Sequence, residues 1–153
     1  MNFNFGAFCV DIDVQATQDF YNTYGKTVLE YCDCMNCRNY YVAISTVSSK
    51  IRNFFKSIGI DPQKTPEATL WYTDKSGFAH YSLIFHVVGT IIHAIDIYKP
   101  FGTTGFQLIP ENFYELDNNF KVGFTSKIHL LDKNFPQPCV QVEIITSLPW
   151  LLK

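Results

Sequence analysis

A long amphipathic stripe is the sequence feature that most restricts how this chain can fold. Between about residues 37 and 58, large apolar side chains recur every three or four positions, which places them on one side of an α-helix. The members of this stripe are Tyr40, Tyr41, Ile44, Val47, Ile51, Phe54, Phe55 and Ile58. Gly59 follows, and glycine commonly ends a helix in the left-handed conformation. The pattern predicts one long helix over about 37–58, whose apolar face must pack on another layer.

Alternating apolar and polar residues predict that this other layer is a β-sheet. Residues 8–14 alternate strictly, as expected for a strand with one buried face. Segments 68–73 and 78–88 are separated by a turn sequence and are typical of a hairpin. Alternation returns in residues 120–130 and 140–144. We therefore expect an α+β fold in which the long helix packs on one face of a mostly antiparallel sheet.

Length and composition favour one globular domain over residues 1–153. A chain of 153 residues that is 47% hydrophobic can fill a single core, and no linker or repeat divides it. Fourteen Phe and nine Tyr are more than a core of this size usually needs. Aromatic residues are enriched at binding surfaces, so we expect some of these rings to line a groove or an oligomer interface.

Charge and hydropathy exclude several classes of partner. The formal net charge is −2, and no cluster of Lys and Arg is present that could neutralise several phosphates, so we expect no nucleic-acid ligand. Residues 1–14 carry Asp11 and Asp13 where a signal peptide would be apolar. The longest apolar stretch, residues 83–97, is interrupted by His, Gly and Asp and is shorter than the roughly 20 residues of a membrane span. We expect a cytoplasmic protein without a membrane partner.

Three cysteines close together form the most specific chemical motif. The chain has five cysteines, an odd number that does not suggest a disulfide framework, so reduced thiols are expected. Cys32, Cys34 and Cys37 fall within six residues at the junction between a predicted strand and the predicted helix, a spacing that can bind a soft or borderline metal such as zinc. Cys9, Cys139 or a histidine would supply a fourth ligand if the fold brings it near. Redox chemistry, or simple packing of these thiols, are the alternatives.

Three further residues are candidates for binding. Arg38 and Asn39 directly follow the cysteine motif, and His86 lies in a predicted strand. His80 would share a strand face with His86, but six positions correspond to about 20 Å, too far for both to bind one metal. The chain contains none of the common catalytic motifs, so no catalytic residue is assigned.

Several short signatures resemble those of a group of small bacterial proteins to which no activity is assigned. They are the run from Cys32 to Tyr40, Gly59-Ile60-Asp61-Pro62, Phe85-His86-Val87-Val88-Gly89 and Leu148-Pro149-Trp150. This resemblance implies a bacterial origin and a single-domain fold, and it carries no chemistry with it.

Three functions are consistent with these observations. We expect first a small bacterial interaction protein, of the kind that neutralises a toxin, whose partner is another protein or a second copy of the chain. The alternative is a metalloprotein with a structural zinc site at Cys32, Cys34 and Cys37. A thiol-dependent enzyme that uses Cys34 or Cys37 with His86 nearby ranks third.

Overall fold

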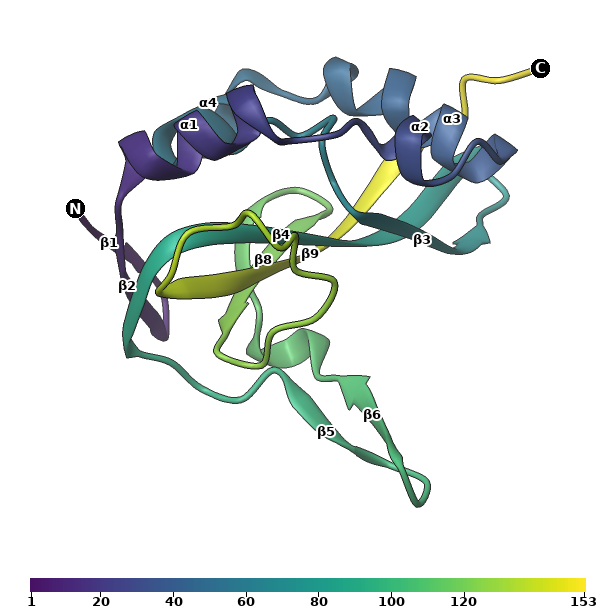
Figure 1. The fold of residues 1–153 in the computed structure, drawn as a ribbon. Coiled ribbons are helices and arrows are strands. Elements are labelled where there is room, and N and C mark those ends of the chain that lie inside the picture. Colours follow the sequence, from purple (N-terminus) through teal and green to yellow (C-terminus); the bar gives the residue numbers. More distant parts are fainter.

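The computed structural model describes residues 1–153 and shows an α+β fold in which helices cover one face of a large antiparallel sheet (Figure 1). The helices are α1 (Val14–Thr23), α2 (Val28–Tyr31), α3 (Met35–Ala43) and α4 (Ser49–Ile58), with 3-10 turns η1 (Ile44–Thr46) and η2 (Pro110–Asn112). The strands of the large sheet are β1 (Asn2–Phe5), β2 (Phe8–Ile12), β3 (Glu67–Thr73), β4 (Phe78–His93), β7 (Tyr114–Asp117), β8 (Phe120–Thr125) and β9 (Cys139–Pro149). The predicted α+β class and antiparallel sheet are confirmed. No helix has the length and apolar character needed to cross a membrane.

The 16-residue strand β4 organises the sheet. The strand order is β1-β2-β4-β9-β8-β7, and β3 also pairs with β4. Every pairing is antiparallel. Along one edge, β3 pairs with the first part of β4 and β2 pairs with its last part, while β9 follows the opposite edge.

Helix α1 completes the edge of β4 in the interval between β3 and β2. The Tyr21 hydroxyl donates to the carbonyl of His86 (2.9 Å) and accepts from its N–H (3.1 Å), and Thr17 Oγ1 accepts from the N–H of Val88 (2.9 Å). These side chains replace the partners that a neighbouring strand would provide, because buried backbone groups need hydrogen bonds. The contacts fix α1 along this edge of β4.

The prediction of one long helix over 37–58 is wrong. The chain forms α3, the short turn η1 and then α4, because Val47 and Ser48 adopt extended backbone conformations. Ser48 Oγ accepts from the N–H of Ile51 and caps the start of α4, and the Arg52 guanidinium donates to the carbonyl of Val47. Both helices bury their apolar residues on the same sheet, so the stripe continues across the break. Gly59 ends α4 in the left-handed conformation, as predicted.

The core lies between the helices and the sheet and contains many of the large rings. Phe55 of α4 packs edge-on against Phe85 of β4 and Phe120 of β8, and Tyr40 of α3 packs edge-on against Tyr81. The core therefore absorbs many of the rings that composition assigned to a surface. The large aromatic side chains that stay exposed are Tyr24, Tyr31, Trp71, Tyr72, Phe78, Phe101 and Phe106.

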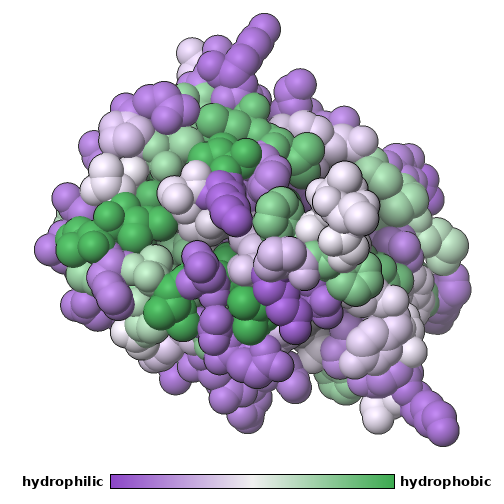
Figure 2. Space-filling view, turned by 90° about the horizontal axis from the view of Figure 1, so that it is seen from below, coloured by the Kyte–Doolittle hydropathy of each residue, from purple (hydrophilic) through white to green (hydrophobic).

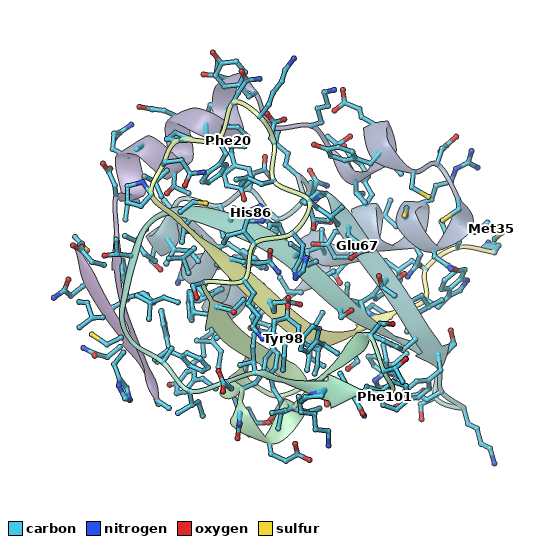
Figure 3. All side chains as sticks on the ribbon, turned by 60° about the horizontal axis from the view of Figure 1, so that its bottom comes forward. Phe20, Met35, Glu67, His86, Tyr98 and Phe101 are labelled. Carbon is cyan, nitrogen blue, oxygen red and sulfur yellow. The ribbon has the colours of Figure 1, made fainter.

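The face of the sheet opposite the helices carries a small second sheet and a long loop instead of helices. A second, two-stranded sheet formed by β5 (Tyr98–Phe101) and β6 (Gly105–Leu108) projects from the body as an arm (Figure 1). The connection between β8 and β9, residues 126–138, packs beside it. Figure 3 shows Glu67, His86 and Tyr98 on this side of the sheet.

Candidate functional site

The three cysteines of the predicted motif come together at the junction of α2 and α3. Cys32 follows α2, Cys34 is the residue before α3, and Cys37 lies in the first turn of α3. Their Sγ atoms all lie within 4.8 Å of one another. Cys37 is buried, whereas Cys32 and Cys34 are exposed. We refer to residues 32–37 as the thiol turn.

An ion pair closes the thiol turn on its solvent side. Arg38 Nε and Nη2 donate to the two carboxylate oxygens of Asp33, each at 2.8 Å. The pairing lowers the pKa of the Asp33 carboxyl through the hydrogen bonds and the charge of Arg38. Both side chains are largely exposed, so the pair contributes little to stability. The ion pair between Asp33 and Arg38 restricts the conformation of the thiol turn. The Arg38 side chain makes no other hydrogen bond.

Asn39 anchors α3 to the end of the chain. Its side chain is completely buried; Nδ2 donates to the carbonyl of Pro149 (3.2 Å), and Oδ1 accepts from the N–H of Leu151 (2.7 Å). Asn39 Nδ2 also donates to the Tyr81 hydroxyl (3.3 Å), which in turn donates to the carbonyl of Asn36 (2.8 Å). The structure thus gives Asn39 an anchoring contact that holds the thiol turn against β4 and β9.

The surroundings shift the thiol pKa values of Cys34 and Cys37 in opposite directions. The backbone N–H of Cys37 at the start of α3, followed by the thiol of Cys32, lowers the pKa of Cys34. Burial, followed by the neighbouring thiols, raises the pKa of Cys37. Cys34 therefore ionises before Cys37, and Cys37 ionises more readily once a cation compensates the charge of its thiolate.

The thiol turn has the chemistry of a site for a soft metal ion. Sulfur ligands of zinc lie about 2.3 Å from the metal, which places two tetrahedral sulfurs about 3.8 Å apart. The observed spread of up to 4.8 Å needs only small side-chain rotations to reach that arrangement. No fourth Cys, His, Asp or Glu joins the group, so Cys9, Cys139 and the histidines are not brought to it.

His86 belongs to a separate polar cluster on the opposite face of the sheet. It is buried, and its Nε2 donates to the carbonyl of His129 (2.9 Å) with Gln141 Oε1 at 3.3 Å. Both neighbours are acceptors, which assigns the proton to Nε2. Burial lowers the pKa of His86, so its imidazole is neutral near pH 7. His86 makes no hydrogen bond with a cysteine, so the thiol-dependent enzyme stays a prediction.

Two residues of this cluster were not predicted from the sequence. Gln141 Oε1 accepts from the N–H of His129 (2.6 Å), and its Nε2 donates to Glu143 Oε2 (2.7 Å) and to the Tyr98 hydroxyl (3.3 Å). Burial, with a smaller effect of the Glu67 charge, raises the pKa of Glu143 to about 7. Gln141 and Glu143 alternate in the sequence with Val140, Val142 and Ile144. Nothing in the sequence showed, however, that the side of the strand carrying Gln141 and Glu143 would be covered by other parts of the chain.

Comparisons with known proteins return no match, whether the chain is set against family models, curated proteins or solved structures. The resemblance to a bacterial group through short signatures stays a prediction. The functional proposal accordingly depends on the residues of this chain alone.

Proposed function

We propose that this protein binds one soft or borderline metal ion, zinc in the first instance, through the thiolates of Cys32, Cys34 and Cys37. The observation that supports this proposal is the convergence of the three Sγ atoms to within 4.8 Å. Thiolates that approach one another repel unless a cation lies between them, and sulfur donors select zinc and copper(I) over magnesium or calcium.

The ion would stabilise the connection between two helices. Cys32 lies at the end of α2 and Cys37 within α3, and α3 is itself anchored to β4 and β9 by Asn39. A bound ion therefore fixes α2 relative to the sheet. Because the chain supplies three ligands and two of them are exposed, the fourth coordination position faces solvent and takes water or an external donor.

Metal content tests the proposal. Untagged protein purified without chelators should contain about one zinc per chain by elemental analysis, and Cys32 and Cys34 should react with an alkylating reagent only after a chelator is added. Cys34→Ser should lose the metal, whereas Cys9→Ser, at a partly exposed cysteine outside the thiol turn, should retain it. Protein that stays metal-free after exposure to zinc, with unchanged thiol reactivity, would overturn the proposal.

The interaction function expected from aromatic content stays a prediction. Trp71 and Phe101 are the most exposed aromatic side chains, at 64% and 65%. On the face shown in Figure 2, hydrophobic residues form several groups with hydrophilic residues between them, so this view shows no single broad apolar surface. The neutralisation of a toxin has no further support from the geometry.

A further inference from the structure

Two cysteines of the thiol turn differ sharply in their access to solvent. Cys34 is exposed and directly precedes α3, whereas the side chain of Cys37, in the first turn of α3, is only 5% exposed. Figure 3 shows Met35, the residue that follows Cys34, at the periphery of the molecule, and Met35 is itself 52% exposed. A reagent in solution therefore reaches Cys34 much more easily than Cys37.

The start of α3 has a geometry that allows Cys34 and Cys37 to form a disulfide. The two residues are three positions apart across the first helical turn, where an α-helix places Cα atoms about 5 Å from each other. Disulfides usually join Cα atoms about 4.4–6.8 Å apart. The two Sγ atoms already lie within 4.8 Å, so rotation of the side chains is enough to bring them to bonding distance. Asn39 holds this turn against β4 and β9 without involving either thiol.

Cys32 is the thiol that such a bond leaves unpaired. It follows α2, outside the first turn of α3, and it is exposed. A disulfide between Cys34 and Cys37 removes two of the three sulfur ligands that the thiol turn offers to a metal ion. A single thiolate does not hold zinc in a protein site, which takes at least three protein ligands.

From this arrangement we propose that Cys34 and Cys37 form a reversible disulfide by exchange with a low-molecular-weight disulfide, RSSR, and that this bond expels the metal ion. The Cys34 thiolate attacks one sulfur of RSSR, the bond between the two RSSR sulfurs breaks, and RS⁻ leaves. The Cys37 thiolate then attacks the Cys34 sulfur of the mixed disulfide and displaces the second RS⁻. The two cysteine thiols lose two electrons and two protons, and RSSR takes them up as two molecules of RSH.

The exchange makes the metal content of the protein depend on its redox surroundings. Expulsion of the ion rests on the metal binding proposed above, whereas exchange by the metal-free thiols does not. The two states exclude each other, because the same sulfur atoms serve either the ion or the disulfide. By linkage, metal binding disfavours the disulfide to the same extent that the disulfide disfavours metal binding. An excess of RSH reverses the exchange and restores the ligands.

The exchange is tested on reduced, metal-free protein that is treated with glutathione disulfide, quenched by alkylation and analysed by mass spectrometry. We expect the loss of two of the five thiols, no retained glutathione, and a peptide map that joins Cys34 to Cys37. Excess reduced glutathione should restore all five thiols. Unreacted protein, a persistent glutathione adduct, or a bond that includes Cys9 or Cys139 would overturn the proposal.

Three variants assign the roles of the thiols. Cys32→Ser should still form the disulfide, because this residue takes no part in the bond. In that background, Cys37→Ala should retain one glutathione on Cys34, since no neighbouring thiol remains to displace it. Cys9→Ser, outside the thiol turn, is the matched control and should react as the unmodified protein does. Loss of the disulfide in Cys32→Ser, or the absence of retained glutathione after Cys37→Ala, would contradict the assigned roles.

Release of zinc distinguishes this proposal from the proposed function. Protein loaded with zinc should release one ion for each disulfide formed under excess glutathione disulfide, followed with a metallochromic indicator. Disulfide formation in a protein that never binds zinc would contradict the metal site and leave the exchange standing. Zinc binding by a protein whose metal-free thiols form no disulfide would contradict the exchange alone. A disulfide that forms while the ion stays bound would contradict its expulsion.

Discussion

At the scale of single residues, Glu143 makes stability depend on pH. Its pKa is about 7 in the folded protein, raised from 4.5 mainly by burial, so the folded state binds more protons than the unfolded state between these values. The free energy of unfolding should therefore fall as pH rises through that window, by up to about 3 kcal/mol.

Urea unfolding at pH 5 and pH 8 measures this effect. Glu143→Gln should remove this fall in stability with rising pH, leaving the opposite contribution of His86, whose lowered pKa makes stability rise with pH, and at pH 8 the variant should be more stable than the unmodified protein. An unchanged slope in the variant would show that another group is responsible.

Tyr21 provides a second prediction at this scale. Its hydroxyl satisfies both backbone groups of His86, so Tyr21→Phe leaves a buried N–H and C=O without partners. We expect a loss of about 1–3 kcal/mol in the free energy of unfolding, measured in urea. Tyr24→Phe, at an exposed tyrosine of the same segment, is the matched control and should change stability by less than about 0.5 kcal/mol. Equal effects of the two variants would contradict the capping role of Tyr21.

At the scale of elements, Ser48 defines the division between η1 and α4. It caps α4 through the N–H of Ile51 and donates to Asp117 Oδ2 at 2.7 Å, which links the helix to β7. Ser48→Ala should lower the free energy of unfolding by about 1 kcal/mol. Ser45→Ala removes an exposed hydroxyl that bonds only the Val42 carbonyl and should have little effect. A Ser48→Ala protein as stable as the Ser45→Ala protein would argue against this capping contact.

Local patterns and long-range pairing were not equally predictable. The thiol turn follows from spacing within six residues, and alternation identified β2 and β9, because both signals are local. The break at Val47 was missed because the apolar stripe continues on both sides of it. The spacing of apolar residues alone does not show where the backbone leaves the helical conformation. The cluster around Glu143 depends on the register that pairs His86 with Gln141 and Ile84 with Glu143, which is a tertiary property.

At the scale of the whole molecule, the sheet separates the thiol turn from a buried polar cluster. The thiol turn belongs to the helical layer, and the cluster of His86, Gln141 and Glu143 belongs to the opposite face. Variants in the polar cluster should therefore leave metal binding at the thiol turn unchanged, and variants in the two regions should have additive effects on the free energy of unfolding measured in urea.

Removal of the metal should have a modest effect on global stability. Because all three cysteines lie within six residues, the unfolded chain also binds the ion, which reduces the stabilisation expected from binding to the folded state alone. Addition of a chelator should lower the melting temperature by only a few degrees, about 2–4 °C per kcal/mol for a chain of this size. Complete unfolding by the chelator would indicate a larger structural role.

The most direct test of metal binding is a cobalt(II) titration of the reduced protein, followed by absorption. We predict saturation at one ion per chain, with sulfur-to-cobalt charge-transfer bands, displacement by zinc and an apparent affinity that rises from pH 6 to pH 8 as thiols are deprotonated. Cys34→Ser should weaken these bands, and Cys9→Ser should not. A spectrum without charge-transfer bands, or one identical in Cys34→Ser, would contradict metal binding at the thiol turn.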